Sequence, residues 1–483
     1  MLLLFAWAFA RAAEPVVSGD TAQRIDQWLK QLEKDKHFSG GVVVMSGGKT
    51  LLRKGYGWAD RARQLPFGVN TPACMGSITK TFTALGVLRL EEAGKLKVTD
   101  SLARFFPGIP ADKAKITLHQ LMTHSAGFPE VFENDGGDYA KLRKEEFLAR
   151  AFREPLVYAP GSRSLYSNVG MSVAAAVIEE VTGQAYDAFI RNELLQPVGI
   201  TGIAYTYPEQ IQATVAHGYD QGDDWGTLMD RYQQFGGPYW NLYGNGGLYA
   251  SVSDMEAFLR AVLDAKILSP ASLAKQQTRH IVEWDTDGRS FFGYGCALGD
   301  SRRGTPVIQN GGSNGIYFAD MLMYPQEHIA LYIVTNDNRM IANRVMAGVT
   351  QLVFLGRIET DPLAVQARFE SPLAEALYAA IGTRGADEFG KSGSGLIDSL
   401  GVGDNDMILL EVGQQLLREN RREQAIALYE LYTRRFPSIV VAWNDLGDAY
   451  RSVGRKTDAR RCYEQALKIR PGNPRATEAL KML

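Results

Sequence analysis

At 483 residues the chain is longer than a single hydrophobic core usually supports, so at least two domains are expected. Its formal net charge of −2 provides no electrostatic basis for binding nucleic acid. Three scattered cysteines exclude a disulfide framework, and six histidines without an HExxH pattern give no sign of a metal site.

The first predicted element is an export signal. Leu2 to Phe9 is a short apolar run, and Ala10-Arg11-Ala12-Ala13 follows it with the small-x-small pattern of a signal-peptidase site. The run is too short to span a bilayer as a helix. We therefore expect a signal peptide over residues 1–13 and a mature protein that is periplasmic or secreted, with no membrane span.

Strand signals lie at both ends of the next region, with helices between them. Gly40 to Met45 and Thr50 to Arg53 flank a glycine turn, which predicts a β-hairpin. Ser77 to Gly94 has a helical pattern that ends at a glycine, and residues 100–265 mix short helices with loops. Later segments are expected to be strands at 292–298, 307–309, 318–323 and 329–334, and a helix at 342–355. This order predicts one α+β domain over 14–355 whose terminal strands share a sheet.

The C-terminal part contains an internal repeat with a period of 34 residues. The matching pairs are Val412-Gly413 and Leu446-Gly447, Ala425 and Ala459, Tyr429 and Tyr463, and Pro437 and Pro471. This is the tetratricopeptide period, and it predicts an all-α module of two repeats and a capping helix over 404–483. Residues 356–403 are expected to connect the two domains. The module either stabilises the fold or binds a protein partner, including a second copy of the chain.

A candidate nucleophile lies at the start of the helix predicted from Ser77. In Ser77-Ile78-Thr79-Lys80 the serine and the lysine are three residues apart and share one helical face. A serine hydroxyl needs a nearby base at neutral pH, and the helix N-terminus adds positive potential at the attacked atom. For Lys80 to act as this base, its pKa must fall from about 10.4 to about 7–8.

The Ser-x-x-Lys pattern occurs three times, so the surrounding sequence must decide between the copies. Ser46-Gly-Gly-Lys49 lies in the predicted hairpin turn, where its glycines have a structural purpose. Ser272-Leu-Ala-Lys275 follows a proline on a short helix and has no related motif near it. These observations favour Ser77 as the nucleophile.

Further segments resemble a known family in their order along the chain. They are Thr71 to Lys80, Ile116 to Gly127, Pro160-Gly161 with Tyr166 to Gly170, Glu179 to Gly183, and Gly246 to Ser251 with Asp254. Together they resemble the class C β-lactamase-like serine hydrolases of the β-lactamase and penicillin-binding protein superfamily. The resemblance covers residues 20–355. It implies an antiparallel sheet flanked by helices, a helical subdomain, and catalysis without a metal or organic cofactor.

The same resemblance implies roles for two residues of the second motif. Tyr166 would share proton transfer with Lys80 and protonate the leaving group. Asn168 would hold Lys80 and the acyl chain of the substrate. Two other segments also match Tyr-x-Asn, at Tyr239 and at Tyr243, but only Tyr166 follows the family's Pro-Gly pair.

The third family motif is Lys or His, then Thr or Ser, then Gly, and here the sequence departs from it. In the corresponding stretch Gln309 replaces the basic residue and Asn310 the hydroxyl residue. The resemblance implies that Gln309 and Gly311 border the substrate, and that the Gly312 amide completes an oxyanion hole with the amide of Ser77. The alternative is a strand and a glycine turn without a catalytic role.

These motifs predict a serine hydrolase that forms an acyl-enzyme on Ser77. Because a neutral Gln309 binds a carboxylate less well than a cation does, an esterase or amidase acting on small substrates is favoured. The alternatives are a D-alanyl peptidase or β-lactamase, and a catalytically weak protein that recruits a partner through its repeats. His124-Ser125 resembles part of a Ser-His-Asp triad, but the family resemblance favours a structural role for His124.

Overall fold

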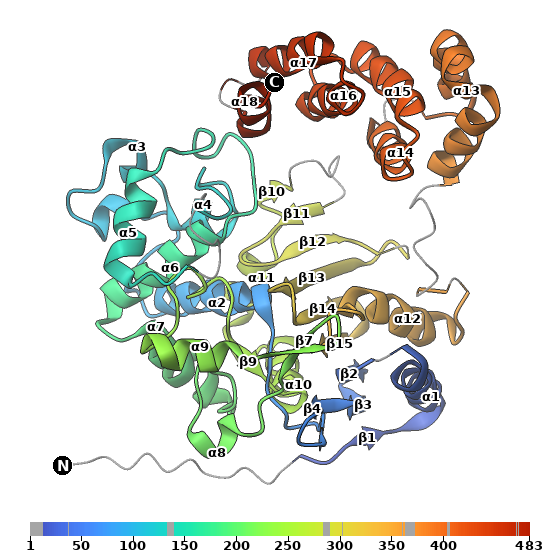
Figure 1. The fold of residues 1–483 in the computed structure, drawn as a ribbon. Coiled ribbons are helices and arrows are strands. Elements are labelled where there is room, and N and C mark those ends of the chain that lie inside the picture. The colour runs from blue at the N-terminus through green and yellow to red at the C-terminus, as the bar shows by residue number, and fades with distance from the viewer. Residues whose placement is uncertain are drawn as a thin grey trace. The chain divides into compact units, whose positions relative to one another are not determined.

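The computed structural model describes residues 13–36, 38–132, 140–283, 290–301, 303–359, 361–362, 372–402, 406–469, 471 and 473–483. The chain divides into two compact units, Met1–Asp361 and Pro362–Leu483 (Figure 1). The predicted signal peptide lies outside the described residues except for Ala13. Among the described helices, none has both the length and the apolar character needed to cross a membrane.

The first unit is built on a nine-stranded antiparallel sheet. Its strand order is β1-β3-β2-β15-β14-β13-β12-β11-β10. In that order the strands are Val16–Val17, Lys49–Tyr56, Gly40–Ser46, Ile329–Thr335, Phe318–Tyr324, Pro306–Ser313, Ala297–Asp300, Ser290–Phe292 and Ile281–Val282. The expected hairpin is confirmed as β2 and β3. Because β2 pairs with β15, the early and late strands share one sheet, as the sequence predicts.

Three two-stranded sheets complete the strand structure of this unit in the described residues. They are β4 Trp58–Asp60 with β5 Leu65–Pro66, β6 Ala73–Cys74 with β9 Tyr249–Ala250, and β7 Gly218–Asp220 with β8 Asp223–Gly226. Strand β6 lies directly before the candidate nucleophile in the chain. Its pairing with β9 therefore joins the segment that leads to Ser77 to the Gly246–Ser251 motif.

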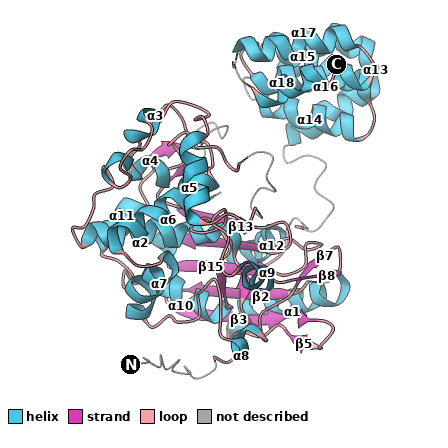
Figure 2. Ribbon diagram, turned by 60° about the vertical axis from the view of Figure 1, so that its left-hand side comes forward, coloured by secondary structure: helices cyan, strands magenta, loops and turns pink. Residues whose placement is uncertain are grey.

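Helices pack on both faces of the large sheet (Figure 2). Helix α12 (Ala342–Leu355) packs on β14 and β15, and α1 (Gly19–Lys36) packs on β3 and α12. Helix α10 (Val252–Leu263) packs on β2, β3 and β15 from the opposite face, within the main core. Because helices cover both faces of the sheet, its inner strands must be apolar on both faces. All seven residues of β15 are buried.

The remaining helices of the first unit include the one that carries the candidate nucleophile. The short helices are η1 Gly76–Ile78, η2 Leu102–Arg104, α3 Ala111–Ala114, α4 Leu118–Met122, α7 Tyr186–Phe189, η4 Ile190–Leu195, η5 Gln196–Val198, α8 Glu209–Gln212 and η6 Pro325–Glu327. The longer ones are α2 Thr79–Glu92, α5 Lys144–Arg153, α6 Asn168–Thr182, α9 Leu228–Phe235 and α11 Pro270–Gln276. Every residue of α2 from Thr79 to Leu88 is buried, so this helix forms the centre of the core.

The expected strand at 292–298 is interrupted in the structure. Strands β11 and β12 are separate, and the Gly293 amide donates a hydrogen bond to the Cys296 carbonyl across a tight turn. Gly295 adopts a positive φ of 64°, and a Cβ at this position would lie 2.5 Å from the Lys80 carbonyl oxygen. The glycine therefore allows the turn to approach helix α2 closely.

Strand β14 carries a buried acid, Asp320, which makes stability depend on pH. Burial raises the pKa of Asp320 from about 3.8 to about 7. Between these values the folded state retains a proton that the unfolded state releases, so stability falls as the pH rises from about 4 to about 7. At 1.36 kcal/mol per pH unit, the loss is up to ~4 kcal/mol.

Asp320→Asn is therefore expected to raise the melting temperature at pH 8, and the gain should shrink as the pH is lowered toward 4. Thermal unfolding followed by circular dichroism across this pH range measures the effect. Asp223→Asn, which removes an exposed carboxylate on β8, is the matched control and should show no such trend. A gain for Asp320→Asn that is the same at pH 4 and pH 8 would contradict this account.

The second unit consists of helices in the described residues, and it extends further upstream than expected. Its helices are α13 Pro372–Ser399, α14 Asp406–Arg418, α15 Arg422–Arg435, α16 Val440–Ser452, α17 Lys456–Ile469 and α18 Pro474–Lys481. Helix α13 lies in the predicted connecting segment 356–403, yet it contributes buried residues such as Leu377 and Phe389 to the second core. The connection is therefore shorter than the sequence indicated.

Helix α13 begins one repeat period before α14 but lacks the repeat motif. It breaks at Gly385, where φ is 76° and ψ is 172°. Starting positions 372, 406, 440 and 474 are spaced by 34 residues, so α13 supplies a third helical hairpin before the two predicted ones. In the later hairpins a Cβ at Gly413 or Gly447 would lie 2.3 or 2.6 Å from a tyrosine ring. In α13 the corresponding positions are Ala379 and Gly395, and both are exposed, so this helix lacks the glycine–tyrosine contact of the later hairpins.

Candidate active site

Ser77 lies at the junction between a 3-10 turn and the central helix. It is the middle residue of η1, which continues directly into α2. Gly76 has a φ of 51°, a left-handed conformation that glycine adopts readily, and it starts the turn that partly exposes Ser77. Helix periodicity then places Lys80 beside the serine, and the Lys80 Nζ donates a hydrogen bond of 3.0 Å to the Ser77 Oγ.

The Lys80 side chain is held in a buried position. Lys80 is 2% exposed, and its Nζ donates a second hydrogen bond of 2.7 Å to the backbone carbonyl of Asn245. The Nζ also lies 4.7 Å from the centre of the Tyr166 ring. Sequence reasoning did not find Asn245, because a backbone acceptor has no residue signature.

Asn245 itself belongs to one of the Tyr-x-Asn segments that the sequence set aside. Its side-chain amide donates to the Ser172 hydroxyl and the Asn241 carbonyl, and these bonds hold the carbonyl that faces Lys80. Tyr243 of the same segment is 7% exposed, and its hydroxyl donates to the carboxylate of Asp187. The Tyr243 hydroxyl is therefore bound at Asp187 and not at Ser77.

A cavity of about 270 Å³ opens at Ser77 and gathers most of the predicted residues. Its described lining consists of Ser77, Lys80, His124, Tyr166, Glu283, Ser290, Phe292, Gly295, Cys296, Ala297, Gln309, Asn310 and Gly311. The alternative nucleophile Ser272 lies elsewhere, on α11, where Lys275 forms an ion pair of 2.7 Å with Glu91. Ser77, Lys80 and Tyr166 therefore line the same cavity.

Asn168 lies outside this lining. It is the first residue of α6, and it borders a different hollow together with Phe132, Phe147 and Asn241. Its backbone amide donates to the Glu130 carbonyl at 3.0 Å. The role expected for Asn168, which is to hold Lys80 and the acyl chain of a substrate, therefore stays a prediction.

His124 is neutral and structural in this arrangement. Burial, with a further contribution from the charge of Lys80, lowers the pKa of His124 to about 3. Its Nδ1 accepts a hydrogen bond of 3.1 Å from the Ser167 amide, so the neutral ring carries its proton on Nε2. The ring lies 4.7 Å from that of Tyr166. With so low a pKa His124 is a poor base near neutral pH, and it supports the position of Tyr166 instead.

Strand β13 places Asn310, and not Gln309, against helix α2. Asn310 pairs with Met321, which pairs with Tyr332, and both partners belong to the core that contains α2. Because side chains alternate along a strand, Asn310 and Gln309 point to opposite faces of β13, with Asn310 toward α2, and both residues border the Ser77 cavity. The Asn310 amide donates to the Thr81 hydroxyl and, at 2.8 Å, to the Gly295 carbonyl. Asn310 is thus the residue of this stretch whose side chain reaches α2, and the role predicted for Gln309 stays a prediction.

Backbone amides also alternate in direction along β13, and this favours the amide of Ser313 over that of Gly312 as the second oxyanion donor. The Asn314 amide donates to Tyr317 across the β13–β14 hairpin, and backbone amides point to alternate sides of a strand. The Gly312 amide thus points toward β14, and the Ser313 amide points away from it. A Cβ at Gly76 would lie 2.5 Å from the Ser313 nitrogen, so this amide borders the turn that carries Ser77. Gly312 instead provides close contact, since a Cβ there would lie 2.0 Å from the Met75 carbonyl oxygen.

Residues 25–352 match the family model described as Beta-lactamase, which covers more than half of the chain. The chain belongs to this β-lactamase family of serine hydrolases. A second match, at residues 440–473, is to the tetratricopeptide repeat. Repeats of this type stack into extended surfaces that bind proteins.

Relatives of this β-lactamase family member are penicillin-binding proteins. The chain is 30% identical over 271 residues to the putative penicillin-binding protein PbpX of Bacillus subtilis, and the match covers 56% of this chain and 65% of PbpX. The octameric penicillin-binding protein homologue from Pyrococcus abyssi has a TM-score of 0.61 at 25% identity, over 74% of this chain and 81% of that one. A penicillin-binding protein from Bacillus halodurans has a TM-score of 0.58 at 25% identity, over 67% and 98%.

Proposed function

We propose that this protein hydrolyses small esters or amides through an acyl-enzyme on Ser77. The observation that carries this proposal is the 3.0 Å hydrogen bond between the Lys80 Nζ and the Ser77 Oγ at the mouth of a cavity. A buried lysine next to a serine is a candidate base, because desolvation favours its neutral form. Membership of the β-lactamase family supports the same chemistry.

In the proposed reaction the Ser77 Oγ attacks the carbonyl carbon while its proton passes to the Lys80 Nζ. The negative charge that develops on the carbonyl oxygen is stabilised by the backbone amides of Ser77 and Ser313. Tyr166 then passes a proton to the leaving group as the carbonyl–heteroatom bond breaks, and the Lys80 Nζ returns the serine proton to Tyr166. Water then attacks the acyl-enzyme and gives a proton to the Lys80 Nζ. The bond from the Ser77 Oγ to the acyl carbon breaks, and the Oγ takes up that proton from Lys80.

The second candidate is a D-alanyl peptidase or β-lactamase, which the names of the relatives favour. Its substrates carry a carboxylate, and a cation beside the third motif would help to bind it. In this chain the position that faces α2 holds the neutral Asn310. We therefore favour esters and amides without a carboxylate, and covalent labelling of Ser77 by a penicillin would favour the peptidase. The proposed action takes place outside the cytoplasm, in line with the predicted signal peptide.

Exposure of the purified protein to a fluorophosphonate is expected to add one adduct, because only an activated serine reacts readily with this reagent. Intact-mass spectrometry measures the adduct. The Ser77→Ala variant should remain unmodified, whereas Ser272→Ala should be labelled like the wild type. A folded wild-type protein that takes no adduct would contradict the proposed hydrolase function.

A further inference from the structure

The acceptor that holds Lys80 is a backbone carbonyl, so its position depends on the loop that carries it. This carbonyl belongs to Asn245, in the loop 236–248 between α9 and β9, and it accepts a hydrogen bond of 2.7 Å from the Lys80 Nζ. An ammonium group has three N–H donors and a neutral amine has two, so Lys80 can make this bond in either protonation state. The bond can therefore persist while Lys80 takes up the serine proton and passes it on.

Ser172 of helix α6 binds this loop at two points. Its hydroxyl accepts a hydrogen bond of 2.7 Å from the side-chain amide of Asn245 and donates one of 2.7 Å to the carbonyl of Tyr243. Because a hydroxyl has one proton and a carbonyl can only accept, the direction of both bonds is fixed. Ser172 is fully buried, and α6 begins just after Tyr166 in the chain. The loop is thus attached to the helix that follows the second motif.

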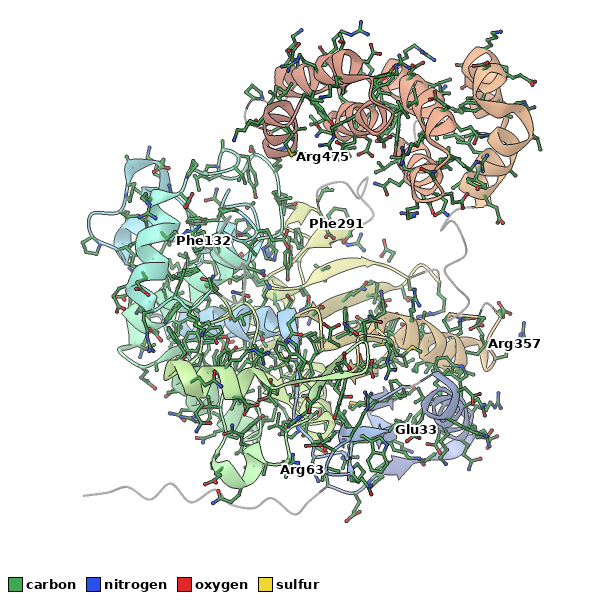
Figure 3. All side chains as sticks on the ribbon, viewed as in Figure 1. Glu33, Arg63, Phe132, Phe291, Arg357 and Arg475 are labelled. Carbon is green, nitrogen blue, oxygen red and sulfur yellow. The ribbon has the colours of Figure 1, made fainter. Side chains whose placement is uncertain are left out.

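Thr83 attaches the same loop to α2, the helix that carries Lys80. Its hydroxyl donates a hydrogen bond of 2.5 Å to the Gly244 carbonyl and therefore accepts the bond of 2.6 Å from the Tyr186 hydroxyl. Thr83 is fully buried, about one helical turn after Lys80. Helices α2 and α6 pack against each other, and side chains fill the space between them (Figure 3). Both helices therefore fix the loop immediately before the carbonyl that Lys80 uses.

We propose that Ser172 and Thr83 are positioning residues of the Ser77 site, which keep the Asn245 carbonyl in contact with Lys80. This inference rests on the proposed hydrolase function. Neither residue belongs to the described lining of the cavity, so neither touches the substrate. Loss of either hydroxyl leaves a buried carbonyl without its donor, and the loop must shift to satisfy it. A displacement of about 1 Å at a reacting group can lower the rate about 100-fold.

Ser172→Ala and Thr83→Val test the proposal from two different helices. Hydrolysis of 4-nitrophenyl butyrate is followed by release of nitrophenol, and the rate with Ser77→Ala protein is subtracted as background. We expect kcat to fall at least about tenfold in each variant, because the base is displaced. We expect KM to stay within about twofold of the wild type, because the walls of the cavity are unchanged.

Two matched variants separate positioning from a general loss of packing. Thr83→Ser retains the hydroxyl that Thr83→Val removes, so it should restore kcat to within about threefold of the wild type. Tyr243→Phe removes a hydrogen bond of the same loop, the one of 2.8 Å to the carboxylate of Asp187, but leaves the loop carbonyls bound. It should retain the wild-type kcat. Circular dichroism and thermal unfolding show that each variant is folded at the assay temperature.

Two results would overturn the inference. One is a wild-type kcat in Ser172→Ala or in Thr83→Val, and the other is a fall in Tyr243→Phe as large as in these variants. The hydrolase proposal would survive either result, because Ser77-dependent turnover by the wild type supports it separately. No turnover by the wild type above the Ser77→Ala background would overturn the hydrolase proposal and the positioning roles with it.

Discussion

Lys80→Ala is expected to lower the rate at which Ser77 becomes acylated by about 10²- to 10⁴-fold, the usual contribution of a positioned general base. The Lys80 Nζ lies 3.0 Å from the Ser77 Oγ, and alanine leaves the hydroxyl without this proton acceptor. The rate of fluorophosphonate adduct formation, followed by intact mass, measures the change.

The fold should persist in this variant, because Lys80→Ala removes a buried amine and leaves the apolar side of α2 intact. Circular dichroism and thermal unfolding check this point. Lys275→Ala is the matched control, since Lys275 belongs to the Ser-x-x-Lys segment on α11 and pairs with Glu91. Acylation of Lys80→Ala at the wild-type rate would rule out the serine–lysine mechanism.

Gly312→Ala is expected to lower kcat/KM by about 100-fold or more, in the range seen when one oxyanion donor is lost. A Cβ at this position would lie 2.0 Å from the Met75 carbonyl oxygen and 3.0 Å from the Ser77 nitrogen. The strand and the nucleophile turn must therefore separate, which displaces the Ser313 amide relative to Ser77. Steady-state hydrolysis of 4-nitrophenyl butyrate measures the loss. The added methyl group should also lower the free energy of unfolding by about 1–3 kcal/mol, because it overpacks the contact with Met75.

The neighbouring glycine provides the control for this substitution. A Cβ at Gly311 would meet no atom within 4 Å, and its φ is not in the left-handed region. Gly311→Ala should therefore change the free energy of unfolding by no more than about 0.5 kcal/mol, against the loss of about 1–3 kcal/mol expected for Gly312→Ala. Equal losses in the two variants would show that the close approach of Gly312 to Met75 is not what matters.

Short-range patterns in the sequence predict the serine–lysine pair, the first hairpin and the sheet. The 3.6-residue period placed Ser77 and Lys80 on one helical face, and the structure brings the two side chains together on η1 and α2. The glycine turn between β2 and β3 and the apolar runs of the late strands likewise predicted the β2–β3 hairpin and the sheet. These features depend on spacings of a few residues, which the order of residues along the chain specifies directly.

Repeats and strand faces were harder to predict, because they depend on what lies opposite each residue. Gly395 stands where the later repeats have a tyrosine, so α13 lacks the motif although Leu377 and Ile397 are buried in the second core. On β13 a shift of one residue exchanges the two faces of the strand, and only the pairing with β14 shows that Asn310 faces α2.

The sequence by itself therefore determined the family, the position of the candidate nucleophile and base, and the 34-residue period, because each is carried by short-range order in the chain. The tertiary structure decided which carbonyl holds Lys80, which amide borders Ser77 and which carboxylate lines the cavity. Asn245, Ser313 and Glu283 come from segments more than 150 residues away from Ser77 in the chain. Only the packing of the sheet against α2 brings such segments into contact, and no local pattern records that packing.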